Sequence, residues 1–344
     1  MTLSPPTRPD DAQALDADES KGVTSSNHAS GSRGASAGGH RSGRRHRIAK
    51  RGARATGRRV SKAVARAVVD SRVTRSSVKM LGRVLPSPRV HLTRYEIVLP
   101  RLPRHLDGLR VLHLSDLHLH PGSELALQVP ALIADESYDL ACYTGDFINI
   151  DADIPAVATL LARMPRGAPA YAVLGNHDYV PFGRDRGAND VRRLRGVLTD
   201  AGLTVLTNEA RQVHTERGNG LYVAGVDDPA TRRDDLAGAM SGVPEDACAL
   251  ALAHSPDVVL RMGARRPDLI LAGHTHGGQI RLPRVGALLT LSALPKPLAM
   301  GLGAYAGVPL FVSRGIGYST LNLRVGTPSE VALLTLRSPV ATQQ

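Results

Sequence analysis

Five short apolar segments of this chain each end in histidine, aspartate or asparagine residues. Their sequences, in chain order, are RVLHLSDLH, LACYTGD, YAVLGNHD, ALALAH and LILAGHTH. Short apolar runs bounded by glycine and polar residues are typical of buried strands, and an α/β sheet places its ligand site at the carboxyl ends of its strands. The pattern therefore predicts an α/β fold in which polar side chains from five strands meet at one place.

The spacing of the apolar runs predicts more strands than helices. Strands are expected at residues 95–99, 110–114, 140–144, 170–174, 221–226, 249–253, 269–272, 310–313 and 331–336. Helical stretches are expected at residues 124–136, 154–163, 188–201 and 256–262. Because helices lie between only some of the strands, we expect a four-layer αββα sandwich of two mixed β-sheets flanked by helices.

The net charge of the chain lies in its N-terminal quarter. Residues 1–84 contain 18 Lys or Arg against 6 Asp or Glu, and the rest of the chain contains 25 of each sign. We expect a disordered, low-complexity basic tail at 1–57, a basic helical linker at 58–89 and one domain at 90–344. Within the linker, residues 58–85 would either contact an anionic membrane or pack loosely and fray in water.

The cysteines and the apolar runs indicate the cellular compartment of the protein. Cys142 and Cys248 each lie in an apolar run, so we expect reduced thiols, with a disulfide as the lesser alternative. No apolar run is long enough to span a membrane, and the N-terminus lacks the apolar region of a secretory signal. These features predict a cytoplasmic protein, peripheral at the membrane if its linker binds lipid.

The polar residues at the strand ends indicate a metal site. Converging carboxylates and imidazoles are costly to bury without a compensating charge, which metal ions supply. Ligands of these types without thiolate suit Mn, Fe, Zn or Ni, and their number implies two divalent ions about 3.5–4 Å apart, an arrangement that hydrolyses phosphate esters. The candidate ligands are Asp116, His118, Asp146, Asn176, His254, His274 and His276.

At this point the chain resembles the calcineurin-like metallophosphoesterases, over roughly residues 90–337. The resemblance rests on the ordered motifs Asp116-x-His118, Gly145-Asp146, Gly175-Asn176-His177-Asp178, His254 and Gly273-His274-Thr275-His276. The segments GHTHGGQIRLP, FVSRGIG and PSEVALLTL are similar to those of the bacterial branch that includes the YkuE and YaeI types. The resemblance implies the calcineurin-like phosphoesterase fold.

The resemblance also implies a role for each polar group. One ion would be held by Asp116, His118 and His276, and the other by Asn176, His254 and His274, with Asp146 bridging the two. His177 would act as the general acid that protonates the leaving group after attack by a metal-bridging hydroxide. Asp178 would orient the ring of His177.

Other polar groups have two interpretations each. Asp227 or Asp228 would lie at the rim of the site, with Asp227 as the expected substrate-binding residue, or one of them would cap a helix. Arg314 would contact substrate phosphate or cap a sheet edge. His113 lies inside an expected strand and is interpreted as a core residue. Whether His120 approaches the site as a further histidine stays open.

Two hypotheses for the function follow. The first is a metal-dependent phosphoesterase acting on a phosphomonoester, phosphodiester or pyrophosphate, with a lipid or nucleotide substrate, such as a UDP-diacylglucosamine-like lipid, implied by the branch resemblance. The second is a binding protein with a non-catalytic domain, whose basic tail engages nucleic acid or anionic membrane. Few aromatic residues accompany the basic ones, which argues against specific single-strand recognition. The oligomeric state is open.

Overall fold

The computed structural model describes residues 89–181, 187–282, 284–319 and 323–339. The tail expected at 1–57 lies outside the described residues, as does all but the last residue of the linker expected at 58–89. The first described strand begins at Val90. Everything below concerns the described residues.

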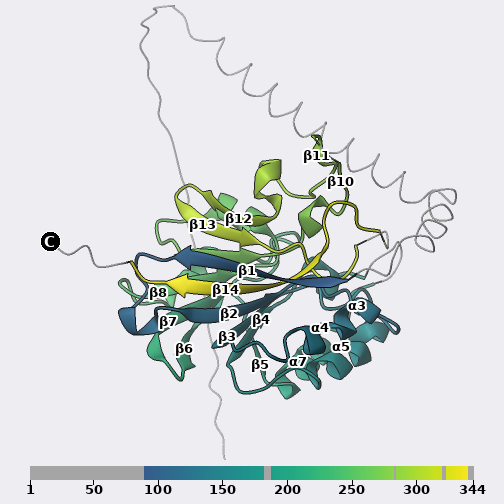
Figure 1. The fold of residues 1–344 in the computed structure, drawn as a ribbon, viewed down its shortest axis with the longest axis horizontal. Coiled ribbons are helices and arrows are strands. Elements are labelled where there is room, and N and C mark those ends of the chain that lie inside the picture. The colour runs from purple at the N-terminus through teal and green to yellow at the C-terminus, as the bar shows by residue number, and fades with distance from the viewer. Residues whose placement is uncertain (1–88, 182–186, 283, 320–322, 340–344) are drawn as a thin grey trace, which may run out of the picture. The chain divides into compact units, whose positions relative to one another are not determined.

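The first sheet has six strands in the order β1-β14-β2-β3-β4-β5 (Figure 1). They are β1 (Val90–Val98), β14 (Ser329–Arg337), β2 (Leu109–Leu114), β3 (Leu140–Thr144), β4 (Ala170–Val173) and β5 (Leu203–Val205). The strands from β2 to β5 are parallel, whereas β14 pairs antiparallel with β2 and parallel with β1. The carboxyl ends of β2, β3 and β4 therefore lie at one edge of this sheet.

The second sheet also has six strands, in the order β12-β13-β9-β8-β7-β6. They are β12 (Gly301–Tyr305), β13 (Val308–Val312), β9 (Leu269–Ala272), β8 (Cys248–Leu252), β7 (Gly218–Gly225) and β6 (Glu209–Thr215). The four central strands are parallel and the two edge strands are antiparallel to their neighbours. A separate hairpin is formed by β10 (Arg281–Leu282) and β11 (Gly286–Ala287).

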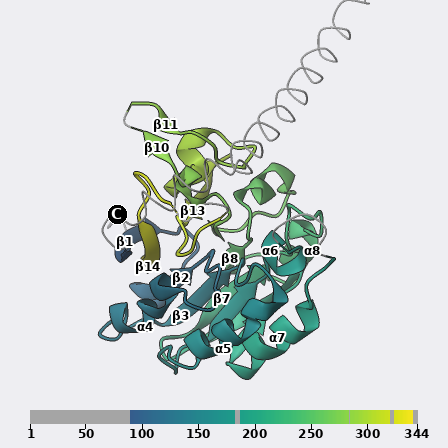
Figure 2. The same ribbon diagram turned by 90° about the vertical axis from the view of Figure 1, so that its right-hand side faces the viewer.

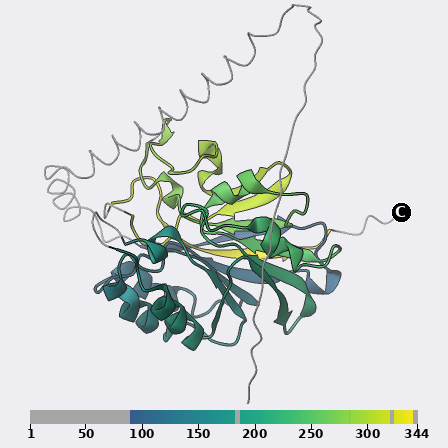
Figure 3. The same ribbon diagram turned by 180° about the vertical axis from the view of Figure 1, so that it is seen from behind.

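Helices cover the outer face of each sheet. The first sheet carries α3 (Glu124–Leu127), α4 (Val129–Leu132), α5 (Ile154–Leu161) and α7 (Val191–Asp200), grouped on one side in Figure 2. The second sheet carries α8 (Leu236–Ser241) and the 3₁₀ helix η3 (Pro256–Arg261) (Figure 3). The remaining short helices of the described residues are η1 (Arg104–Leu106), η2 (Asp151–Asp153), α6 (Asn176–Tyr179), η4 (His276–Gly278) and η5 (Lys296–Ala299).

The core has three apolar layers. The middle one lies between the sheets and joins residues such as Val111 and Cys142 of the first sheet to Leu250 and Phe311 of the second. Successive side chains of a strand point to opposite faces, so Leu112 instead packs with the helices. Both faces of the central strands are buried, which explains why their sequences are continuous apolar runs rather than alternating ones.

The four-layer αββα sandwich expected from the sequence is confirmed. All nine expected strands overlap observed ones, but β5, β6, β10, β11 and β12 were not expected, because they are short or carry many polar residues. The helix expected at 124–136 is divided into α3 and α4, and the one expected at 256–262 is the 3₁₀ helix η3. Both cysteines are buried free thiols, as expected. Among the described residues, no helix has the length and apolar character needed to cross a bilayer.

Candidate metal centre

Six of the seven expected ligands come together where the strands of both sheets end, and the seventh, Asn176, lies at the end of β4. Asp116, Asp146 and Asn176 follow β2, β3 and β4 of the first sheet. His254 and His274 follow β8 and β9 of the second. Two groups have ligand atoms within 4.8 Å of one another: Asp116 with His118 and His276, and Asp146 with His254 and His274.

The backbone at these positions has an uncommon conformation. Five of the seven expected ligands have a positive φ, between 42° and 69°, and they are Asp116, His118, Asp146, His274 and His276. A positive φ is rare for residues other than glycine and is sterically unfavourable. Local backbone preference therefore does not explain these turns, which place the side chains within reach of one another.

In the first group, ring nitrogens and a carboxylate face one another. Nε2 of His118 lies 3.2 Å from Nε2 of His276. Nε2 of His276 lies 3.4 Å from Oδ1 of Asp116. All three side chains are buried. Two neutral imidazole nitrogens that face each other at this distance cannot both be satisfied without a proton or a cation between them.

The second group is joined to the first by Asp146. Nε2 of His254 lies 3.2 Å from Oδ2 of Asp146 and 3.1 Å from Nδ1 of His274. The same carboxylate oxygen lies 3.5 Å from Nε2 of His118 in the first group. One oxygen of Asp146 thus lies between the two groups.

Asn176 contributes a polar atom without a partner. Its Oδ1 is buried and has no hydrogen-bond partner among the described residues. A buried carbonyl oxygen left in this way is costly, since the desolvation of the group is not compensated. The unpaired oxygen, the facing imidazole nitrogens and the buried carboxylates all fit a site for divalent cations.

Hydrogen bonds on the far side of each ring orient the ligands. Nδ1 of His254 donates to the carbonyl of Thr144 at 2.7 Å, so the proton of the neutral ring lies on Nδ1 and the lone pair on Nε2. Nδ1 of His118 lies 2.9 Å from Oδ1 of Asn149, which favours the same tautomer. Such outer contacts fix ring orientation in metal sites.

The carboxylate of Asp116 is fixed by close packing as well as by hydrogen bonds. The backbone N–H of His274 donates to both of its oxygens at 3.0 Å, and the hydroxyl of Ser115 donates to Oδ2 at 2.7 Å. A Cβ at Gly273 would lie 2.3 Å from Oδ2 of Asp116 and 1.8 Å from the Ser115 hydroxyl. Only glycine leaves room for this approach between the two sheets.

Burial keeps most of the histidines neutral. It lowers the pKa of His118 to about 3 and that of His274 to about 4, and it holds the pKa of His276 well below its usual value. Burial is also the largest single effect on the pKa of His254 and acts to lower it. The charge and hydrogen bond of Asp146, together with the charges of Asp116 and Asp228, outweigh burial and raise that pKa well above its usual value. The site thus combines three neutral imidazoles, which have lone pairs available for a cation, with the carboxylate of Asp146.

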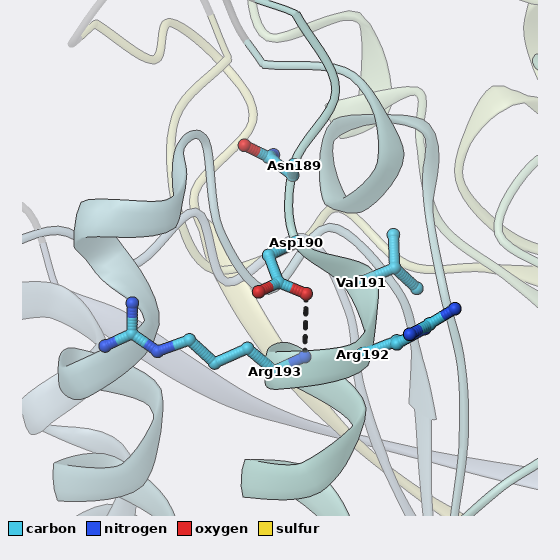
Figure 4. A pocket seen from close by; sticks show the side chains of 5 residues that line it. All are labelled: Asn189, Asp190, Val191, Arg192 and Arg193. Atoms are coloured by element: carbon cyan, nitrogen blue, oxygen red, sulfur yellow. Dashed lines mark hydrogen bonds between the residues drawn. The ribbon is translucent and has the colours of Figure 1, made fainter.

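His177 lies beside the first group. Its ring centroid is 5.3 Å from that of His118 in an edge-on arrangement, and its backbone N–H donates to Oδ1 of Asp146 at 2.8 Å. The side chain of Asn189 donates to the carbonyl of His177 at 2.8 Å. Figure 4 shows a pocket near this point, lined by five consecutive residues at the start of α7 from Asn189 to Arg193.

Asp178 has a different set of contacts from the expected one. Its buried carboxylate accepts hydrogen bonds from four backbone N–H groups, those of Asp146, Phe147, Ile148 and Gly175. These contacts fix the loops after β3 and β4, and orientation of the His177 ring by Asp178 stays a prediction.

The two expected substrate-binding residues are engaged with protein groups. Oδ1 of Asp227 accepts a hydrogen bond from the hydroxyl of Tyr179 at 2.6 Å, and Asp227 is buried rather than open at a rim. Arg314 forms an ion pair with the buried carboxylate of Glu330, a contact that neither interpretation from the sequence included, and its contact with substrate phosphate stays a prediction. His113 is a core residue, as expected, and His120 is exposed with its ring against the carbonyl of Pro121.

Two residues near the site were not identified from the sequence as functional, and a third, Asp228, was expected with Asp227 at the rim of the site or as a helix cap. Asn149 holds His118, as described above. The guanidinium of Arg324 lies 3.1 Å from Nδ1 of His276. Asp228 is fully buried, and its Oδ1 has no hydrogen-bond partner among the described residues. Only Asp228 had a local signal, because it follows an apolar strand as the ligands do.

Comparison with known proteins shows that the chain is similar to metallophosphoesterases. The family model described as calcineurin-like phosphoesterase matches residues 109–278. The uncharacterized metallophosphoesterase YkoQ of Bacillus subtilis is 35% identical over 227 residues, which cover 65% of this chain and 82% of that protein.

Two similar proteins have named activities. Phosphodiesterase YaeI of Escherichia coli is 31% identical over 255 residues, covering 70% of this chain and 88% of YaeI. UDP-2,3-diacylglucosamine pyrophosphatase LpxG of Chlamydia muridarum is 27% identical over 291 residues, covering 71% of this chain and 88% of LpxG.

Proposed function

The chain belongs to the calcineurin-like metallophosphoesterases and is a hydrolase, and we propose that it uses two divalent ions to hydrolyse a phosphodiester or pyrophosphate bond. The observation that carries the proposal is the position of Asp146 Oδ2, 3.5 Å from Nε2 of His118 and 3.2 Å from Nε2 of His254. A carboxylate oxygen shared in this way is suited to a bridging ligand.

The residues divide into two ion sites. Asp116, His118 and His276 would hold one ion, and Asn176, His254 and His274 the other. Asp146 would be shared. The ligand types suit Mn, Fe, Zn or Ni. When bound, the ions would activate the attacking water and neutralise charge on the phosphoryl oxygens.

The chain's own groups supply the remaining chemistry. A leaving oxygen needs a proton as its bond to phosphorus breaks, and His177, whose ring lies beside His118, is the residue proposed to donate it. Its position is held from the backbone, since its N–H donates to Asp146 and its carbonyl accepts from Asn189. Asp178 holds the loops that carry Asp146 and Asn176.

The substrate class is proposed from the named relatives. YaeI is named a phosphodiesterase, and LpxG is named a pyrophosphatase of a diacylglucosamine nucleotide. Both activities break a bond to a phosphorus atom that carries a second substituent. We therefore place diesters and pyrophosphates ahead of monoesters for this chain.

The test is metal-dependent hydrolysis by the full-length protein. Chelator-stripped protein receives Mn, Zn, Fe(II), Ni or Mg separately, and turnover is measured with bis(p-nitrophenyl) phosphate and with p-nitrophenyl phosphate. We expect at least one ion to restore turnover, with the diester preferred, and two equivalents of bound metal.

The matched variants are Asp146→Asn and Asp246→Asn. Asp246 is an exposed carboxylate just before β8, at the opposite end of that strand from His254, so its variant controls for loss of an acidic group. Asp146→Asn should lose metal and turnover together, and Asp246→Asn should keep both. Normal turnover in Asp146→Asn would refute the shared-ligand role, and absence of bound metal in the unchanged protein would refute the proposal.

A further inference from the structure

The hairpin that follows the metal centre exposes a group of large apolar side chains. Its members are between 41% and 60% exposed, and they are Leu282, Val285, Leu288 and Leu291. Val325 lies alongside them, because its carbonyl accepts the N–H of Arg281 at 2.8 Å, and it is also exposed. Clustered exposed apolar residues mark an interaction surface more often than isolated ones do. We call the described residues 281–282 and 284–291 the apolar hairpin.

The charged residues of the hairpin itself are positive, although the carboxylate of Asp257 accepts hydrogen bonds from Ser292 and Ala293 just beyond Leu291. Residues 269–329 contain no Asp or Glu, and their five basic residues are Arg281, Arg284, Lys296, Arg314 and Arg324. Two of these, Arg281 and Arg284, lie in the apolar hairpin itself. The surface therefore combines apolar side chains with positive charge. Residues 1–84 have the same sign of net charge, which disfavours them as its partner.

The apolar hairpin is tied directly to the metal centre. The helix η4 begins at His276, an expected ligand, and ends only three residues before β10. Gly278 of that helix packs against β11, since a Cβ there would lie 2.5 Å from Cβ of Ala287. In Figure 2 the hairpin stands at the end of the described domain farthest from α5 and α7. A surface bound by the hairpin would thus lie next to the helix η4, which begins at an expected ligand.

From these observations we propose that the apolar hairpin inserts into the surface of an anionic lipid bilayer and holds the metal centre at the membrane. Burial of apolar side chains at the interface supplies the non-electrostatic part of the attraction. Attraction between Arg281 and Arg284 and anionic headgroups supplies the rest. The binding stands independently of the hydrolytic chemistry, and its use for a membrane-borne substrate rests on the proposed function.

The first experiment measures the local environment of the apolar hairpin in the full-length protein. Val285→Cys is labelled with an environment-sensitive dye. The native thiols of Cys142 and Cys248 are buried, which directs the label to the new residue. Val98→Cys is the matched control, since Val98 is similarly exposed but lies at the end of β1.

The expected result is local to the hairpin. With phosphatidylglycerol vesicles, the dye at residue 285 should shift to the blue and become protected from iodide, and the dye at residue 98 should not. Phosphatidylcholine vesicles should give a much weaker response. A dye at residue 285 that stays open to iodide while the protein sediments with vesicles would overturn the proposal and assign binding to another part of the chain. Protection without vesicles would also overturn it, in favour of contact between protein copies.

The second experiment separates insertion from charge and from catalysis. At about 0.5 M salt, exposed charges are screened over a few ångströms, so the apolar contribution should dominate vesicle binding. The double variant Val285→Asp/Leu288→Asp should then bind phosphatidylglycerol vesicles roughly 100-fold more weakly, and Val98→Asp should bind normally. Both should hydrolyse a soluble aryl diester at the unchanged rate, so that failure of insertion is distinguishable from failure of the proposed function. Equal vesicle binding by the double variant and the unchanged protein would overturn the proposal.

Discussion

The backbone N–H of Asp146 donates a hydrogen bond to Oδ2 of Asp178 across 2.9 Å. The same oxygen accepts the N–H of Gly175 at 2.8 Å. Asp146 follows β3, whereas Gly175 follows β4 and precedes Asn176. One buried carboxylate therefore sets the relative position of two loops that carry expected ligands of both ions.

Replacing Asp178 with Asn should weaken both the fold and the metal site. The amide nitrogen would face backbone N–H groups that now donate to a carboxylate oxygen, and each donor left buried and unpaired costs about 1–3 kcal/mol. We expect the free energy of unfolding of metal-free Asp178→Asn to fall by roughly 2–4 kcal/mol, measured by denaturant titration. Metal content measured after dialysis should also fall.

Asp190 provides the control for this variant. It also accepts a backbone N–H, that of Arg193 at 3.1 Å, but it is an exposed N-cap of α7 (Figure 4). Asp190→Ala should cost about 1 kcal/mol of stability and leave metal content unchanged. If the two variants lost the same stability and neither lost metal, the role of Asp178 in holding the ligand loops would be wrong.

His177→Ala should lower turnover without lowering metal content. A general acid typically contributes about 10²–10⁴-fold, and most when the leaving group is a poor one. We therefore expect the loss in kcat to be large for a diester with an unactivated phenyl leaving group and much smaller for one with p-nitrophenyl. Steady-state rates for both substrates, with metal analysis of the same samples, test this.

The dependence on the leaving group is the informative part of that test. An equal loss with both substrates would assign His177 to binding or positioning rather than to proton donation. Loss of bound metal would mean that its backbone contact with Asp146 had been disturbed.

The placement of the ligands could be predicted because its signals are local. Asp116 and Asp146 each follow an apolar strand directly, and parallel strands bring their carboxyl ends to the same edge. The role of Asp178 could not be predicted, because its partners come from the loop after a neighbouring strand, and the sequence GNHD does not reveal them. Arg324 lies 48 positions from His276, so only the fold shows that they are in contact.

The fold was predictable for a similar reason. Central strands such as β8 are buried on both faces, and continuous apolar runs identify them. The edge strand β6 is mostly polar and half-exposed, and its position depends on pairing with β7, which the sequence does not show. The exposed hairpin of β10 and β11 is apolar without being core, so an apolar pattern alone cannot distinguish it from a buried strand.

Asn149→Ala should weaken metal binding although Asn149 is not an expected ligand. Its Oδ1 lies 2.9 Å from Nδ1 of His118 and favours the tautomer with a lone pair on Nε2. Removal of such outer contacts typically lowers metal affinity about 10–100-fold. Competition with a chelator of known affinity measures the change.

Asn149→Asp is the matched variant, because a carboxylate still accepts the proton from Nδ1. It should keep a metal affinity close to that of the unchanged protein. If Asn149→Ala and Asn149→Asp were equally weakened, the effect would come from the loop that contains residue 149 and not from orientation of the His118 ring.

Removal of metal should lower the thermal stability of the protein. Asp116 and Asp146 are buried, and ions that bind only the folded chain stabilise it by mass action, about 2.7 kcal/mol for one site at 100 times its dissociation constant. For a domain of this size, each kcal/mol corresponds to about 2–4 °C, so chelation should lower Tm by roughly 5–10 °C and re-addition should restore it. Calorimetry with and without Mn or Zn measures the shift.

The shift in Tm should be greatly reduced in Asp146→Asn and retained in Asp246→Asn, because only the former lacks the carboxylate that both groups share. A full shift in Asp146→Asn would mean that the stabilising ions bind elsewhere.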